Sequence, residues 1–159
     1  MLDLIFAFKF VHVLAAATMF GVWLCLAIVM LLGHRSRNPS VVAVTAQFVV
    51  GIEKSVMIAV ILVQPISGFP LAWTIGLSPL NEFWIASSLA LYAVVVACWL
   101  AAFRIETRIR RLSRHAVLTA APLPDGYGRL FRGWLALAVV LLLAMSIIFA
   151  LMVWQPRLD

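Results

Sequence analysis

His12 is the residue whose type and position are best suited to chemistry in this sequence. It lies within a long hydrophobic stretch, three residues after Lys9. At such a position an imidazole commonly serves as an axial ligand to haem iron, as a ligand to copper or another transition metal, or as a proton-transfer group. A neutral histidine that hydrogen-bonds to a neighbouring helix is the structural alternative. The sequence therefore predicts a functional site at His12 and leaves these four roles open.

A haem at His12 would commonly take a second axial ligand. His34 lies at the far end of the same stretch, about 33 Å away at 1.5 Å per residue, and His115 lies in a polar segment. Two-histidine ligation within one chain is therefore disfavoured, which leaves His12 alone, His12 with a methionine, or the two His12 residues of a homodimer. Met152 lies at a depth comparable to that of His12, and we predict it as a candidate cofactor ligand. Copper held by His12 with Met19 or Met152 is a further alternative.

Gln64 and Pro65 are the polar and helix-breaking residues near the middle of another apolar stretch. Proline at this position frees the carbonyl group four residues earlier and leaves an amide side chain beside it. The pair could line a cavity or brace a kink, and we favour the kink. The chain has no Ser-His-Asp set, no glycine-rich phosphate loop and no zinc-type His/Cys spacing, and we expect no carboxylate within the apolar part of any span. Hydrolysis, phosphoryl transfer and ion-coupled transport are therefore unsupported.

The elements that position these residues follow from composition. The 159 residues are 65% hydrophobic and 11% charged, whereas a soluble domain has roughly 45–50% and about 25%. A membrane-spanning helix needs about 20 mostly apolar residues, and four segments meet this requirement. We predict an all-α fold, a four-transmembrane-helix up-down bundle that forms one transmembrane domain over residues 1–159. The approximate spans are 4–33, 55–75, 83–103 and 134–154.

Two flanking segments are harder to place. Residues 41–52 are either an interfacial lead-in or an N-terminal extension of the second helix, with Glu53 and Lys54 near the lipid headgroups. Residues 104–133 form a basic loop that begins as a helical extension and is broken around Pro122 and Pro124.

The distribution of Lys and Arg predicts the orientation. Ten of these residues flank one side of the membrane, and only Lys9 and Arg157 flank the other. We therefore expect both basic loops in the cytoplasm of a bacterium, and both termini on the outer side of its inner membrane. Membrane lipids, a larger membrane complex or a second copy of the chain are the expected partners. Nucleic acid is not expected, because topology and anionic lipid account for the arginines.

Several short motifs resemble known families. Lys9-x-x-His12 followed by Thr18-Met19-Phe20-Gly21 resembles the first helix of HemJ-like and CopD-like small membrane proteins. An uncharacterised bacterial family of predicted four-helix integral membrane proteins, a domain of unknown function, is similar over nearly the whole chain. The motifs that carry this second resemblance are Gln64-Pro65-x-x-Gly68, Trp84, the Arg-rich segment after the third span, Arg132-x-Trp134 and Leu151-Met152-Val153-Trp154-Gln155-Pro156.

The HemJ resemblance implies that His12 binds haem b. HemJ-like proteins also have a lysine shortly after the tryptophan that opens the third helix, but here Trp84 is followed by Ile85-Ala86-Ser87-Ser88. The missing lysine argues against protoporphyrinogen oxidation. We therefore predict a small b-type haem protein that serves in electron transfer or as a redox accessory subunit. A cofactor-free structural or assembly subunit is the main alternative, and copper handling is the second.

Overall fold

The computed structural model describes residues 2–156, which form long helices and contain no strand. Helix α1 spans Leu2–Arg35, α4 spans Phe83–Leu118 and α5 spans Gly126–Trp154. Helix α2, Pro39–Ile52, continues through the π-helical turn Glu53–Met57 into α3, Ile58–Thr74. Counting α2 to α3 as one helix, four helices are long and apolar enough to cross a membrane. The predicted all-α, four-helix fold is confirmed.

Local sequence sets the helix boundaries. Asn38 caps α2, because its side chain accepts a hydrogen bond of 2.9 Å from the Ser40 amide, and Pro39 occupies the first turn. Gly76 has a positive φ of 77° just after α3, a conformation that suits glycine. These signals explain why the chain reverses at these points.

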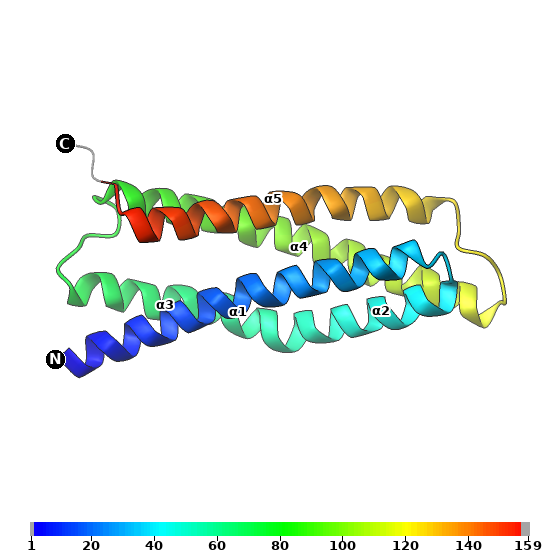
Figure 1. Cartoon of the computed structure of the whole chain (residues 1–159), viewed down its shortest axis with the longest axis horizontal. Coiled ribbons are helices and arrows are strands. Elements are labelled where there is room, and N and C mark those ends of the chain that lie inside the picture. Colours follow the sequence, from blue (N-terminus) through cyan, green and yellow to red (C-terminus); the bar gives the residue numbers. More distant parts are fainter. Residues whose placement is uncertain (1, 157–159) are drawn as a thin grey trace.

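The helices form an up-down bundle (Figure 1). Helix α4 packs along α5 and α2, and α1 packs along α2 and α3. The start of α1 and the end of α5 lie at the same end of the bundle (Figure 1). Arg157 and the end of the expected outer tail, Gln155–Asp159, fall partly outside the described residues.

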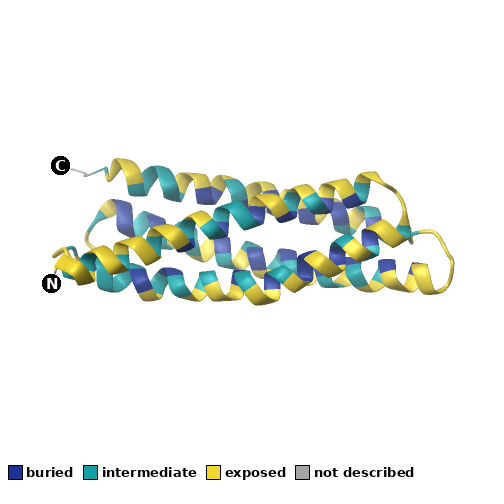
Figure 2. Cartoon of the chain, turned by 60° about the horizontal axis from the view of Figure 1, so that its bottom comes forward, coloured by how far each residue is buried: buried dark blue, intermediate teal, exposed yellow. Residues whose placement is uncertain are grey.

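The outer surface of the bundle is apolar. Large hydrophobic side chains are exposed along all the long helices, and buried residues follow their inner faces (Figure 2). Soluble monomers rarely expose a continuous apolar surface of this extent, whereas lipid tails would cover it in a membrane. The helices therefore contact membrane lipid.

The helices are longer than the predicted spans. A helix of 36 residues is about 54 Å long, compared with a hydrocarbon core of about 30 Å. Helix α4 continues past Phe103 to Leu118, so only residues 119–125 of the expected basic loop 104–133 lie outside helices. Residues 41–52 belong to a helix that is continuous with the second span. This agrees with the alternative in which they extend the second helix at its N-terminus.

Gly33 permits the close approach of α1 and α2. A methyl group at this position would lie 3.1 Å from Thr45 Cβ and closer still to the threonine hydroxyl. We expect Gly33→Ala to lower the free energy of unfolding by about 1–3 kcal/mol through overpacking. Gly21→Ala on the same helix meets no atom within 4 Å and should be neutral or stabilising. Detergent-denaturation curves of both variants would measure this, and equal stabilities would contradict the prediction.

Candidate functional site

His12 lies at the interface of α1 and α3, half-buried against the segment that contains Gln64 and Gly68. Its Nδ1 atom is 3.2 Å from the backbone oxygen of Gln64 and 3.1 Å from Ser67 Oγ. The structure therefore brings together two of the residues that the sequence singled out, and it adds Ser67 and Gly68 to them.

The hydrogen bonds of His12 determine which ring nitrogen carries the proton. A backbone carbonyl can only accept, so Nδ1 is the donor to Gln64. The Ser67 hydroxyl donates to the Val63 carbonyl at 2.7 Å, which leaves its oxygen free to accept from His12 as well. In a neutral imidazole the lone pair then lies on Nε2. Four residues have a fully enclosed polar side-chain atom without a hydrogen-bond partner: Trp23, Glu53, Gln64 and Glu106. His12 is not one of them.

Gly68 provides the space for the imidazole ring. A Cβ atom at this position would lie 2.9 Å from His12 Cε1 and 3.2 Å from Nδ1. Any other residue at 68 would force the ring to move. The Gln64-Pro65-x-x-Gly68 motif thus supplies both the acceptor for His12 and the gap into which the ring fits.

Pro65 and Gln64 have different consequences in the bundle. Helix α3 continues through Pro65, and the carbonyl of Ile61 that this proline leaves free accepts a hydrogen bond of 2.6 Å from the Tyr92 hydroxyl of α4. The Gln64 side chain is 7% exposed, and its Oε1 atom has no partner among the described residues. The proline is therefore compensated, while the amide oxygen is not.

Met152 contacts a different part of the bundle. It is half-buried against a small apolar cluster formed by Ala72, Trp84 and Ile85. His12 instead makes its hydrogen bonds to Gln64 and Ser67. Met152 as a second axial ligand stays a prediction that these contacts do not support.

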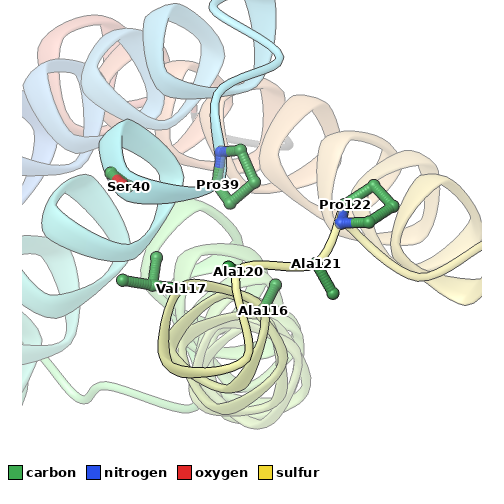
Figure 3. A pocket seen from close by; sticks show the side chains of 7 residues that line it. All are labelled: Pro39, Ser40, Ala116, Val117, Ala120, Ala121 and Pro122. Atoms are coloured by element: carbon green, nitrogen blue, oxygen red, sulfur yellow. The ribbon is translucent and has the colours of Figure 1, made fainter.

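Two surface depressions lie away from His12. One lies where α2 begins and α4 ends (Figure 3), and it is lined by Pro39, Ser40, Ala116, Val117, Ala120, Ala121 and Pro122. The other lies between α1 and α2 and is lined by Thr18, Gly21, Val22, Cys25, Leu26, Phe48 and Ile52. Both linings lack acidic, basic and histidine side chains.

Sequence reasoning missed two buried acids. Glu53 was expected near the headgroups and Glu106 in the basic segment, yet each is 1% exposed inside the bundle. Glu53 accepts a hydrogen bond from the Trp99 indole, and Glu106 accepts one of 2.7 Å from the Trp134 indole. Periodicity could have identified Glu106, because it continues the buried stripe of α4, formed by Val95, Trp99, Ala102, Ile109, Ser113 and Ala116.

Family membership rests on one match. The family described as "Predicted integral membrane protein (DUF2269)" matches residues 6–156. The chain belongs to this family. No curated protein and no solved structure matches the chain. The resemblance to HemJ-like proteins therefore stays a prediction.

The DUF2269 family and the bundle agree on location in a membrane. The family is described as integral to the membrane, and the chain has four apolar helices with lipid-facing surfaces. The protein is accordingly an integral membrane protein with four spans. Within it, polar side chains are buried at the interface of α1 and α3 around His12 and at two acids, Glu53 of the π-helical turn and Glu106 of α4.

Proposed function

We propose that this protein binds haem b through Nε2 of His12 and serves in electron transfer or as a redox accessory subunit of a larger membrane complex. The observation that supports this role is the hydrogen bond from Nδ1 to the Gln64 carbonyl. A histidine that ligates a metal through one ring nitrogen commonly donates from the other to a carbonyl, which fixes the tautomer and the ring orientation. Such a contact is present at His12, with 3.2 Å between Nδ1 and the Gln64 oxygen.

The residues around His12 suit an iron ligand rather than an acid-base pair. Gln64 and Ser67 orient the ring, and Gly68 keeps its face free of a side chain. Bound haem would supply a one-electron iron couple whose potential depends on its axial ligands and on burial. Among residues 2–156, no three His, Cys, Asp or Glu side chains converge on a common point, so His12 is not part of a three-ligand set of these types. The His12 of a second copy would supply a second ligand, since Met152 packs on the cluster of Ala72, Trp84 and Ile85 instead.

The direct test is an oxidised-minus-reduced absorption spectrum of the detergent-purified protein, with a pyridine haemochrome assay on the same sample. We expect a b-type signal at about one haem per chain, or per two chains if a homodimer shares it. A flat spectrum from protein expressed with ample haem would contradict the proposal. Metal analysis of the same sample would identify copper, if copper is bound instead.

Gly68→Ala tests whether haem binding depends on the position of the His12 imidazole, and it leaves the histidine itself unchanged. The added methyl group would displace the His12 ring and break its hydrogen bond to Gln64. Loss of such an orienting contact typically weakens metal binding by about 10–100-fold, and we expect haem affinity to fall by this factor. Gly51→Ala, which meets no atom within 4 Å, is the matched control. Haem titrations that give equal affinities for both variants would rule out the orienting role of the α3 contact.

A cofactor-free structural subunit is the second candidate, and the same contacts favour it. The hydrogen bonds of His12 join α1 to α3, and such bonds in membranes contribute about 0.6 kcal/mol on average. This alternative predicts a colourless protein whose stability, and not its spectrum, responds to changes at His12.

Orientation in a bacterial inner membrane is also part of the proposal. The arginine-rich end of α4 and the basic end of α1 lie at the end of the bundle opposite the start of α1 and the end of α5 (Figure 1). The positive-inside rule then assigns the arginine-rich end to the cytoplasm and both termini to the outer side.

A further inference from the structure

Glu53 and Glu106 are buried on two helices that pack against each other. Glu53 begins the π-helical turn between α2 and α3, and Glu106 lies on α4. Each side chain is 1% exposed, and the hydrogen bond from the Trp99 indole joins Glu53 to α4, the helix that carries Glu106. Carboxyl groups are rarely buried this completely unless they are paired or hydrogen-bonded. The pair is separate from His12, whose partners lie on α3.

Each carboxyl group has one bonded oxygen and one free oxygen. Trp99 donates its indole hydrogen to Oε2 of Glu53, and Trp134 donates its own to Oε1 of Glu106. Oε1 of Glu53 and Oε2 of Glu106 are enclosed and have no partner among the described residues. Two indoles thus hold the carboxyl groups in place, while the free oxygens are left available for a ligand that carries positive charge.

No cationic side chain of residues 2–156 hydrogen-bonds to either carboxyl group. The neighbouring cations Lys54, Arg104 and Arg108 are exposed, and so is Arg132 on α5. Arg110, one turn after Glu106, is half-buried, but its guanidinium donates to Gln47 Oε1 at 3.4 Å and to neither carboxyl group. Helix α1 has no charged residue between Lys9 and His34. Two buried like charges without a counter-ion would be very unfavourable, so the pair requires a bound cation.

The geometry selects the kind of cation. Calcium takes six to eight oxygen ligands and magnesium six, whereas this pair offers two free oxygens and no third His, Cys, Asp or Glu side chain nearby. Neither of the two surface depressions opens onto the pair. A proton needs neither a cavity nor further ligands. It also removes one negative charge and converts a free oxygen into a hydrogen-bond donor.

We propose that Glu53 and Glu106 form a proton-binding site in which the two buried carboxyl groups take up and release protons at their free oxygens, held in place by Trp99 and Trp134. The π-helical turn at Glu53 contributes to this placement, since it changes the helical register at the residue that must face α4. The protein thus has a site for proton uptake and release in its core, adjacent to the predicted spans 55–75 and 83–103.

The test is the infrared spectrum of the purified protein as a function of pH, because protonated carboxyl groups absorb separately from carboxylates. We expect a protonated-carboxyl band at neutral pH that shifts in D₂O. Glu82, which is only partly buried at the start of α4 and accepts no hydrogen bond from an indole, provides the matched control. The band should persist in Glu82→Gln, change frequency and titration midpoint in Glu53→Gln and Glu106→Gln, and disappear in the double variant Glu53→Gln/Glu106→Gln. Glutamine retains the volume and the acceptor for each indole, and circular dichroism would verify folding.

Three outcomes would overturn the proposal. The first is a wild-type protein without a protonated-carboxyl band at neutral pH. The second is a band that survives in the double variant, which would assign it to another acid. The third is loss of the band when Mg²⁺ or Ca²⁺ is added at constant pH, which would show that the free oxygens bind a metal cation.

Discussion

Replacing His12 with alanine should abolish the b-type absorption band of the purified protein, from about one haem per chain to none. His12 is the only histidine of the α1–α3 interface, and its Nε2 atom is the proposed iron ligand. Removal of the imidazole deletes that bond outright, whereas the accompanying loss of hydrogen bonds should cost stability only about 0.5–1.5 kcal/mol. Spectrum and stability therefore separate the two roles of the residue.

His115→Ala is the control, because this histidine is exposed near the end of α4 and should leave the haem content unchanged. Adding imidazole to His12→Ala provides a further distinction, since a free imidazole can occupy the vacated ligand position and restore the band. A band that survives in His12→Ala would exclude His12 as the essential ligand. A colourless wild-type protein with reduced stability in the variant would support the structural role.

Replacing Trp134 with alanine should lower the free energy of unfolding by about 3–5 kcal/mol, the range for a large aromatic residue in a core. Trp134 is 0% exposed, its ring stacks on Trp23 with centroids 6.2 Å apart, and its indole donates to Glu106. The substitution leaves a cavity among α1, α4 and α5 and removes the one hydrogen-bond partner of a buried carboxyl group. The cavity and the lost hydrogen bond both lower the free energy of unfolding.

Trp154→Ala is the matched control, because this tryptophan is 81% exposed and should change stability by no more than about 0.5 kcal/mol. Trp134→Phe separates packing from hydrogen bonding, since it retains most of the ring and loses only the donor, at a cost of about 1–3 kcal/mol. Denaturation in mixed micelles, followed by circular dichroism, measures all three. Equal stabilities of Trp134→Ala and Trp154→Ala would show that Trp134 does not anchor the core.

The fold class could be predicted from the sequence because lipid imposes a strict condition on the backbone. Every amide and carbonyl group in a bilayer must be paired within the protein, so an apolar segment of 20 residues is a helix whatever its neighbours are. The four spans follow from that condition alone. The ends of the helices did not, because α4 continues to Leu118 through a charged segment whose inner face packs on α2 and α5.

His12, Gln64 and Pro65 were identifiable because polar residues and prolines are rare in apolar segments. Their arrangement was not, since the partner of His12 lies 52 residues away, and the need for Gly68 arises only when α1 packs on α3. Glu53 illustrates the same limit more sharply. In the sequence it adjoins Lys54 and resembles a headgroup residue, but the π-helical turn directs it into the core, while Lys54 is exposed. Composition determined which segments are helices in lipid, because hydrophobicity is a local property. Only the tertiary structure decided which face of each helix is buried, because that depends on helices distant in the sequence.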